Sequence, residues 1–406
     1  MKTLRLMGFA IVLLALLVLS GCNVIGLLGP GDSDEGDLLS NEIGEDITSD
    51  RTLESGTTYA VTADVAVSDG ATLTIEEGVT LEFSSNTSLK VKHDASAIEA
   101  DGTSSNPIVM RGEQRQAGFW QGVGIYSKNA RNTLNYVEIR HAGGEDWGIT
   151  GADEAAALMI EEGKRVTLTN STIADSADFG LYGNGNIDLS GFSSNTFTDN
   201  AGPPIEVSAT AAGYIDGATT FSGNGSSYVG VYPRDIEGDM TLSALSGDSP
   251  YRFTDVVTVE SPDGSTVTLT IEDGAVIEFA SDAGITVSDN NSALVADGSS
   301  SGGVLFTGSE EQKGWWRSLL FKSNNDNNLL NNVTVEYAGG ATSMVTGPDQ
   351  KAAIALDDDS YLELTNSTIR HSEGYGVWQY NDTDVTLEAS GNSYDGNESA
   401  DTHVEN

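Results

Sequence analysis

Tryptophans are the residues of this sequence whose chemistry best suits contact with a ligand. Trp120 and Trp316 each end a Gly-aromatic-Trp triplet, whereas Trp147 and Trp378 stand in unmatched contexts. An exposed indole on a regular scaffold is a flat apolar platform that can cover one face of a sugar ring. At a turn the same ring would close off a core, and the repeated triplet favours this second interpretation for Trp120 and Trp316. Trp147 and Trp378 are therefore the better candidates for a ligand contact.

The run Asp357, Asp358 and Asp359 is a candidate site for calcium, a hard cation that binds oxygen ligands. The run fits neither the twelve-residue loop of EF-hands nor the glycine-rich nonapeptide of calcium β-rolls. A solvated acidic loop is the simpler interpretation. No other cofactor is predicted, because the four histidines are far apart in the sequence and a single cysteine excludes a multi-cysteine zinc site.

No catalytic residue is predicted. Glycoside hydrolysis needs two carboxyl groups roughly 5–10 Å apart. With 61 acidic residues, such pairs arise by chance on any fold. The Gly-His-Gly of galacturonases is absent, since His141 lies in Arg-His-Ala and His371 in Arg-His-Ser.

The charge balance excludes one class of partner. The 406 residues include 19 Lys and Arg against 61 Asp and Glu, which gives a formal net charge of −42. Nucleic acids are bound through Lys and Arg on their phosphates, so they are not expected partners. Electrostatic binding to anionic lipid headgroups is disfavoured for the same reason.

Residues 1–21 have the features of a signal peptide. Lys2 and Arg5 precede an apolar run, Leu6–Leu19, which is shorter than the roughly 20 residues of a membrane-spanning helix. The run ends in Leu-Ser-Gly-Cys22, which resembles the lipobox of bacterial lipoproteins. The resemblance implies cleavage before Cys22 and lipidation of its thiol and freed amine, which together would anchor the protein stably. The alternative is an uncleaved signal with an incidental cysteine.

The residue after the cysteine bears on localisation in the cell envelope. Asn23 stands where an aspartate would resemble the inner-membrane retention signal of enteric bacteria. The outer membrane is therefore favoured over the inner membrane. Residues 22–51, which begin at the lipidated cysteine, are rich in Gly, Asp, Glu and Ser and predict a flexible acidic tether.

Comparison of the chain with itself reveals an internal duplication. Thr72-Leu-Thr-Ile-Glu-Glu-Gly recurs as Thr268-Leu-Thr-Ile-Glu-Asp-Gly, and Leu168-Thr-Asn-Ser-Thr-Ile recurs as Leu364-Thr-Asn-Ser-Thr-Ile. Both pairs are offset by 196 residues, so no gap separates them. Shared positions are mainly glycines, small turn residues and alternating apolar residues. The duplication therefore favours a shared scaffold over a shared active site.

Short runs with apolar residues at every second position predict many short β-strands. The inward residues are predicted to be Leu73, Ile75, Leu81, Phe83, Leu269, Ile271, Ile277 and Phe279. Asn170 stands at a predicted corner, and Asn-Gly hairpin signals are not regularly spaced. These features favour a β-solenoid over a sandwich or a barrel.

Three motifs carry a resemblance to the right-handed parallel β-helix proteins of secreted bacterial type. They stand at Thr72–Phe83, Ala100–Ile108 and Gly118–Trp120. The second copy departs from the pattern at Gly303 and Ser318, which stand where the first has Pro107 and Gly122. The resemblance covers roughly residues 52–396 and implies coils of about 20–25 residues that stack on a common core. Members include pectate lyases and polygalacturonases, which act on polysaccharides.

The predicted organisation follows from these patterns. The signal peptide (1–21) and the tether (22–51) precede the first β-helix copy (52–206). Irregular coils (207–262) continue the solenoid into the second copy and the C-terminal end (263–406). The leading functional hypothesis is a non-catalytic, membrane-anchored rod for binding, adhesion or structure, with an extracellular polysaccharide or another surface molecule as its candidate partner. The alternative is a surface-tethered polysaccharide lyase or glycoside hydrolase.

The excess of carboxylates predicts that stability rises with salt. Self-repulsion of this size destabilises a compact fold, and the Debye length falls from about 10 Å at 0.1 M to about 3 Å at 1 M salt. We therefore expect adaptation to a salty habitat and a melting temperature that increases between low and molar sodium chloride. A melting temperature that is flat or decreasing over this range would contradict the interpretation.

Overall fold

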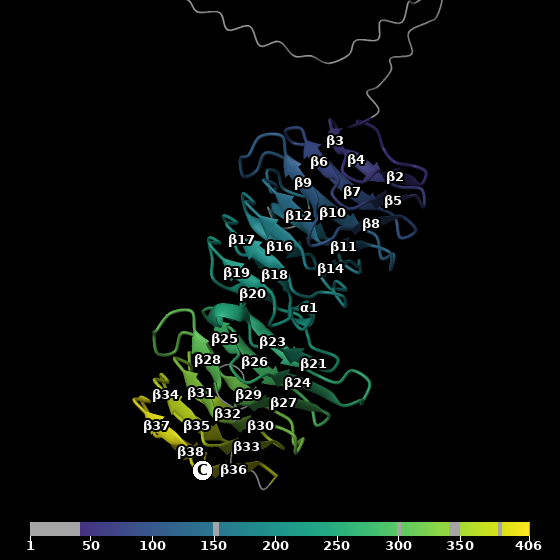
Figure 1. Ribbon diagram of the computed structural model, residues 1–406. Helices are drawn as coiled ribbons and strands as arrows, with labels where there is room; N and C mark the ends of the chain where they lie inside the picture. Colours follow the sequence, from purple (N-terminus) through teal and green to yellow (C-terminus); the bar gives the residue numbers. More distant parts are fainter. Residues whose placement is uncertain (1–40, 149–153, 299–301, 341–349, 381–383, 406) are drawn as a thin grey trace, which may run out of the picture. The chain divides into compact units, whose positions relative to one another are not determined.

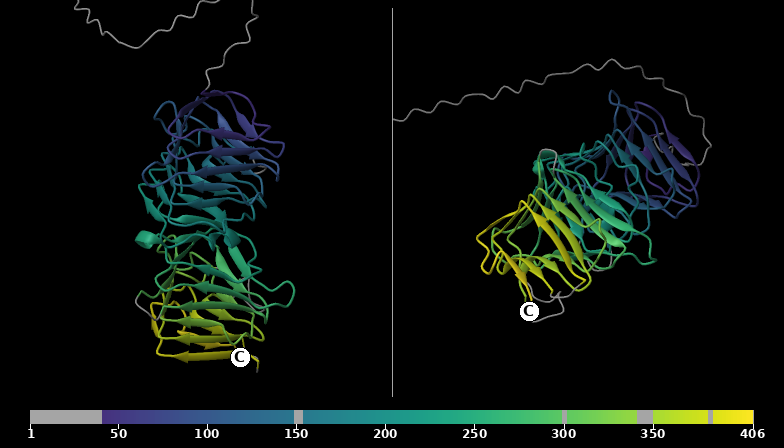
Figure 2. Two further views of the ribbon diagram at one scale, coloured as in Figure 1. Left: turned by 45° about the vertical axis from the view of Figure 1, so that its right-hand side comes forward. Right: turned by 90° about the horizontal axis from the view of Figure 1, so that it is seen from below.

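The folded part of the chain is a right-handed parallel β-helix, which confirms the predicted fold class (Figure 1). The computed structural model describes residues 41–148, 154–298, 302–340, 350–380 and 384–405. Within these residues the strands form five parallel sheets, and strands far apart in sequence lie side by side in each sheet (Figure 2).

Three sheets contain the strands of the first copy. Sheet A consists of β1 (Glu42–Ile43), β3 (Thr58–Val61), β6 (Thr80–Phe83), β9 (Ile108–Gly112), β12 (Val137–Arg140), β15 (Thr172–Ala174), β17 (Thr196–Thr198) and β19 (Thr220–Ser222). Sheet C consists of β2 (Arg51–Leu53), β5 (Thr72–Ile75), β8 (Ala97–Asp101), β11 (Thr133–Asn135) and β14 (Thr167–Thr169). Sheet B begins in this copy with β4 (Val65–Val67), β7 (Ser88–Lys92), β10 (Gly122–Tyr126), β13 (Ala156–Ile160) and β16 (Phe179–Gly183).

Sheet B continues through the second copy, where two further sheets join it. Its remaining strands are β18 (Ile205–Ser208), β20 (Val229–Tyr232), β22 (Tyr251–Phe253), β25 (Val276–Phe279), β28 (Val304–Gly308), β31 (Val333–Glu336), β34 (Thr368–Arg370) and β37 (Ser393–Asp395). Sheet D consists of β21 (Met240–Leu242), β24 (Val267–Ile271), β27 (Ser292–Asp297), β30 (Leu329–Asn331), β33 (Tyr361–Thr365) and β36 (Thr386–Ser390). Sheet E consists of β23 (Val256–Val259), β26 (Gly284–Val287), β29 (Leu319–Phe321), β32 (Ala352–Leu356), β35 (Tyr375–Gln379) and β38 (Thr402–Val404).

Inward side chains form rows that run from coil to coil. Leu81, Met110, Ile139, Ile173 and Phe197 occupy successive paired positions of sheet A, and each is at most 1% exposed. Full burial of one such side chain stabilises the fold by about 1.5–3 kcal/mol. All eight predicted inward residues are likewise at most 1% exposed, so the alternation identified the core correctly.

The coils are less uniform than expected. Paired residues Leu181 and Ile205 are 24 positions apart, whereas Ile139 and Ile173 are 34 positions apart. The expected range of 20–25 residues therefore holds only for some coils. The longer coils carry loops outside the strands, which leave the pairing undisturbed.

The folded region begins earlier than residue 52. Ile43 and Ile47 are 3% and 5% exposed, and both lie in the segment expected to be tether. The acidic residues of this segment bind backbone of the first full coil: Asp46 Oδ1 accepts from Ala66 N and Asp50 Oδ1 from Thr72 N, both at 2.8 Å. Acidic composition suggested a solvated linker, but here carboxylates pair with N–H groups at the edge of the solenoid.

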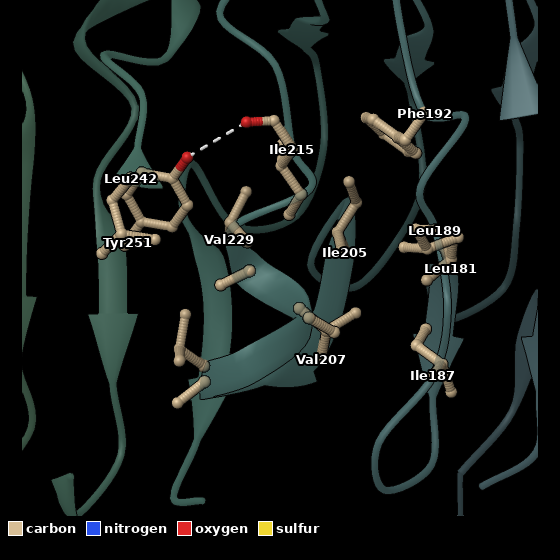
Figure 3. Close-up of a cluster of buried hydrophobic side chains, with 14 of the residues drawn as sticks. Leu181, Ile187, Leu189, Phe192, Ile205, Val207, Ile215, Val229, Leu242 and Tyr251 are labelled. Carbon is tan, nitrogen blue, oxygen red and sulfur yellow. Dashed lines mark hydrogen bonds between the residues drawn. The ribbon is translucent and has the colours of Figure 1, made fainter. Parts of the chain in front are cut away.

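Strands of the segment between the copies pair with strands of both neighbouring parts of the solenoid. The segment contains the short helix α1 (Ala209–Ala212), the 3₁₀ helix η1 (Ser246–Asp248) and five strands, β19 to β23. The Ser208 side chain caps α1 by accepting from Ala211 N. Figure 3 shows the core beneath this segment, where Ile215, Val229, Leu242 and Tyr251 are buried.

Matching strands of the two copies belong to different sheets. Phe83 of β6 lies in sheet A, whereas Phe279, its counterpart 196 residues on, lies in β25 of sheet B. Strands β7 and β10 of sheet B likewise correspond to β26 and β29 of sheet E. Thus the two copies share their coil pattern but differ in which strand of each coil joins sheet B.

Candidate functional site

Trp120 and Trp316 belong to the core, the interpretation that the repeated triplet favoured. Both are 0% exposed. Trp120 stacks on Phe83 with ring centroids 3.8 Å apart, and Trp316 stacks on Phe279 at 4.2 Å. Each indole Nε1 donates to a backbone carbonyl at 2.8 Å. The structure therefore corrects the suggestion that either ring contacts a ligand.

Trp147 and Trp378 lack exposed rings as well. Trp147 is 7% exposed, packs with Met159 and Tyr182, and donates from Nε1 to Ala156 O at 3.0 Å. Trp378 is 0% exposed and packs in a separate cluster that includes Leu320. Neither indole offers a face to a sugar, which corrects the expectation that they are the better ligand contacts.

Two of the three carboxylates in the Asp357–Asp359 run bind other side chains, whereas Asp358 is exposed. Asp357 is 3% exposed, and its Oδ2 lies 3.1 Å from Lys322 Nζ. Asp359 accepts hydrogen bonds from the amides of Asn290 and Asn324, both at 2.9 Å, and these bonds lower the pKa of Asp359. Within the described ranges, no group of three or more His, Cys, Asp or Glu side chains is placed to hold a metal ion.

A groove of about 820 Å³ lies on the outer face of sheet C. Its walls come from four successive strands, β5, β8, β11 and β14, and from the turns that follow Leu53 and Ile75. The lining residues are hydroxyl, carboxyl and amide side chains with one isoleucine: Ser55, Thr74, Ile75, Glu76, Glu77, Glu99, Asp101, Thr133, Asn135, Thr167 and Thr169.

Strand pairing arranges the groove's polar groups in two rows. Thr74, Glu99, Thr133 and Thr167 are paired in succession and form one row. In the other row Asn135 Nδ2 donates to Asp101 Oδ1 at 2.6 Å, and Thr169 Oγ1 donates to Asn135 Oδ1 at 2.9 Å. Neighbouring strands lie about 4.8 Å apart. The groove therefore presents hydrogen-bonding groups at regular intervals from one coil to the next.

The groove is acidic. Glu76, Glu77, Glu99 and Asp101 line it, and the guanidinium of Arg131 binds Glu99 through Nε at 2.6 Å and Nη2 at 2.9 Å. One cation beside four carboxylates leaves a negative surface. Such a surface repels an anionic ligand and accepts hydrogen bonds from hydroxyl groups.

Comparison with the second copy shows which groove residues belong to the shared scaffold and which are particular to the first copy. Asp297, Asn331 and Thr365 repeat the ladder of Asp101, Asn135 and Thr169, with hydrogen bonds of 2.8 and 2.9 Å. At the other row, Val295 and Leu329 stand where the first copy has Glu99 and Thr133. The repeated ladder is therefore part of the scaffold, and Glu99 and Thr133 give the first copy its particular chemistry.

A second polar constellation lies on the outer face of sheet B, centred on Glu206. Met159, Tyr182, Glu206 and Gly230 are paired in succession on β13, β16, β18 and β20. A Cβ at Gly230 would lie 2.5 Å from Glu206 Oε2, so only glycine leaves room for this carboxyl group.

The surroundings of Glu206 favour its neutral form. Burial, followed by the charges of Glu154 and Asp178, raises the pKa of Glu206 from 4.5 to about 7. Burial also raises the pKa of Asp178. A carboxyl group that keeps its proton near neutral pH can act as a general acid.

Sequence reasoning did not identify the groove residues or Glu206. Their neighbours in space are 24 to 34 positions away, as with Glu206 and Tyr182 or Glu99 and Thr133. Only the strand register brings these residues together.

Residues 1–40, which include Cys22, lie outside the described part of the chain. The signal peptide and the lipidation of Cys22 therefore stay predictions. A search of the described residues for a helix long and apolar enough to cross a membrane found none.

The raised pKa of Glu206 predicts a pH-dependent loss of stability. Between pH 4.5 and 7 the unfolded chain ionises at this position while the folded protein keeps the proton, so stability falls as pH rises through this window. The variant Glu206→Gln removes the effect. Its free energy of unfolding should match the wild type at pH 4 and exceed it by about 3 kcal/mol above pH 7.

Denaturant unfolding of both proteins from pH 4 to 8 measures this difference. The exposed-site variant Glu45→Gln is the control and should show no pH-dependent gain. A constant difference between wild type and Glu206→Gln across the range would contradict the assignment.

Comparison with known proteins supports the fold, and the matching region includes most of the groove. A family model described as a pectate-lyase like beta helix domain matches residues 45–154. This span contains all of the groove residues except Thr167 and Thr169. The comparison with curated proteins found no match, and neither did the comparison with solved structures.

Proposed function

We propose that the groove over sheet C binds an uncharged polysaccharide without cleaving it. The observation that carries the proposal is the row of in-register hydroxyl, carboxyl and amide groups along four coils. A polymer with repeated hydroxyl groups can bond to such a row at several coils at once. Its hydroxyl groups donate to the carboxylates, and these charge-assisted bonds are stronger than neutral ones.

The charge of the groove narrows the ligand class. The resemblance of residues 45–154 to a pectate-lyase like domain supports a polysaccharide ligand. Four carboxylates with one neighbouring arginine oppose an acidic polysaccharide, because like charges at short range repel. The proposed ligand is therefore a neutral glycan.

We also propose that the protein is held in the cell envelope by lipid on Cys22, with the outer membrane favoured by Asn23. The support is the signal-length apolar run that ends at the lipobox-like tetrapeptide. In cells of the source bacterium, Cys22→Ser should move the protein from the membrane fraction to the soluble fraction. Unchanged membrane association of the variant would overturn the anchor.

The second copy supplies the variant that tests the groove. Glu99→Val with Thr133→Leu installs the outward residues that the second copy carries at the matching positions, so the strand pairing should tolerate them. We expect wild type to bind a neutral polysaccharide in affinity electrophoresis and the double variant to bind at least about tenfold more weakly, the effect of losing roughly 1.4 kcal/mol of hydrogen bonding.

The matched control is Val295→Ala with Leu329→Ala, which changes the same two outward positions in the second copy. The control should bind like wild type. The proposal fails if wild type binds no neutral glycan in a panel of β-glucan, α-glucan, mannan and xylan. It also fails if the groove variant binds as well as the control.

The raised pKa of Glu206 favours one alternative function, a glycoside hydrolase in which Glu206 is the general acid. Incubation of wild type and Glu206→Gln with the same glycan panel, followed by an assay for new reducing ends, decides between binding and hydrolysis. Cleavage by wild type that is abolished in Glu206→Gln would replace binding by hydrolysis as the function. Absence of new ends in both proteins is the outcome that we expect.

A further inference from the structure

Tyr214 is exposed in a protein that otherwise covers its large apolar side chains. In the described part of the chain, two large apolar side chains are exposed, Tyr214 (39%) and Val404 (50%). Val404 lies in the last strand, β38, whereas Tyr214 directly follows α1 in the segment between the copies. A single exposed aromatic residue is ordinary by itself, so its surroundings decide its meaning.

The backbone around Tyr214 is fixed on both sides. Its N–H donates to Ala211 O at 3.1 Å, and the next residue, Ile215, is 1% exposed. The Ile215 carbonyl accepts a hydrogen bond from the Tyr251 hydroxyl at 3.4 Å (Figure 3). The segment is therefore anchored in the core while the phenol ring points to the surface.

Tyr214 forms one wall of a pocket of about 420 Å³ between α1 and β21. Its apolar lining comes from Ile236, Met240 and Gly213. Gly213 is packed so closely that a Cβ there would lie 2.4 Å from Met240 Cγ. Pockets of about 300–1,000 Å³ with an apolar floor and a few polar groups are typical of small-ligand sites.

The rim supplies those polar groups. Thr210 Oγ1 donates to Asn186 Oδ1 at 2.7 Å and lies 3.0 Å from Ser208 Oγ, which leaves one lone pair to accept a further hydrogen bond. Asp239 Oδ1 accepts from Thr268 N at 2.9 Å, and this bond orients the carboxylate. Thr241 adds a second hydroxyl group. A lining that combines an aromatic residue with hydroxyl and carboxylate groups suits a ring with one apolar face and hydroxyl groups at its edge.

The charges near the pocket argue against an anionic ligand. Burial and the nearby charge of Asp188 raise the pKa of Tyr214, so the phenol is neutral at physiological pH, while Arg165 acts in the opposite direction. Asp239 adds a carboxylate at the rim. An uncharged ligand is therefore favoured here, as it is in the groove.

We propose that this junction pocket is a second carbohydrate site, in which an uncharged pyranose ring stacks on Tyr214 and bonds to Asp239, Thr210 and Thr241. Aromatic residues favour such contacts because one ring face is apolar and flat. Residue 214 lies between the duplicated copies, so the duplication does not repeat this site. The site stands on its own observations and does not depend on the groove.

The test titrates cellohexaose, maltohexaose and mannohexaose into the folded chain by calorimetry, with trigalacturonate as the charged comparison. We expect at least one neutral hexaose to bind, and Tyr214→Ala to weaken this binding about five- to tenfold, the effect of losing one ring stack. Tyr214→Phe keeps the ring and should bind within about twofold of wild type. Trigalacturonate should not bind.

Two further comparisons keep the junction pocket and the groove distinct. The groove variant Glu99→Val with Thr133→Leu should retain the component of binding that Tyr214→Ala removes. Equal affinity of wild type and Tyr214→Ala, or equal loss in Tyr214→Phe and Tyr214→Ala, would overturn the junction site. Binding that depends on Tyr214 alone would support the junction site and contradict the groove.

Discussion

Each coil of this protein can turn around a dry core only if the backbone groups at its corners find partners. Buried asparagines supply many of these partners. Asn195 Oδ1 accepts from Ser171 N at 3.0 Å while its Nδ2 donates to Leu168 O at 2.9 Å. Asn132 and its counterpart Asn328 bind buried backbone N–H groups in the same way. Because unpaired buried N–H and C=O groups are costly, these amides fix one coil over the next and so help to fix the register of the strands that flank these corners.

The chemistry of the surface follows from that register. Once the hydrogen bonds at the corners fix the register, each outward position lies beside its equivalents in the two neighbouring coils. Rows of outward side chains follow from the register alone. The inward rows must stay apolar, but the outward rows are free to vary. Glu99 and Thr133 in the first copy against Val295 and Leu329 in the second show this freedom at matching positions of one scaffold. The same backbone therefore supports a fully polar row in one copy and, in the other, a row whose two central residues are apolar.

The sequence alone was sufficient for the fold because apolar alternation and the 196-residue repeat both reflect the core. It was insufficient for the site. Thr74 and Glu99 are 25 positions apart and Glu99 and Thr133 are 34 apart, so loops of unequal length hide the rows. The prediction of ligand contact at the tryptophans was wrong for another reason. Trp147 lies apart from the main core, but Met159 and Tyr182 pack against it and cover its ring. Ile43 and Ile47 were overlooked because acidic neighbours masked two core residues.

The change of sheet between the copies has a mechanical consequence. Of the five sheets in the described part of the chain, sheet B alone contains strands from both copies. Consider tension applied along the stacking axis of the coils, for instance between a membrane anchor and a bound polymer. At the junction this tension acts chiefly on the ladder between β20 and β22. Within each copy most coils are joined by three ladders, although sheet C ends at β14 and the last coil of the first copy is joined by two. At the junction, therefore, one strand ladder and the shared apolar core carry a load that several ladders carry elsewhere.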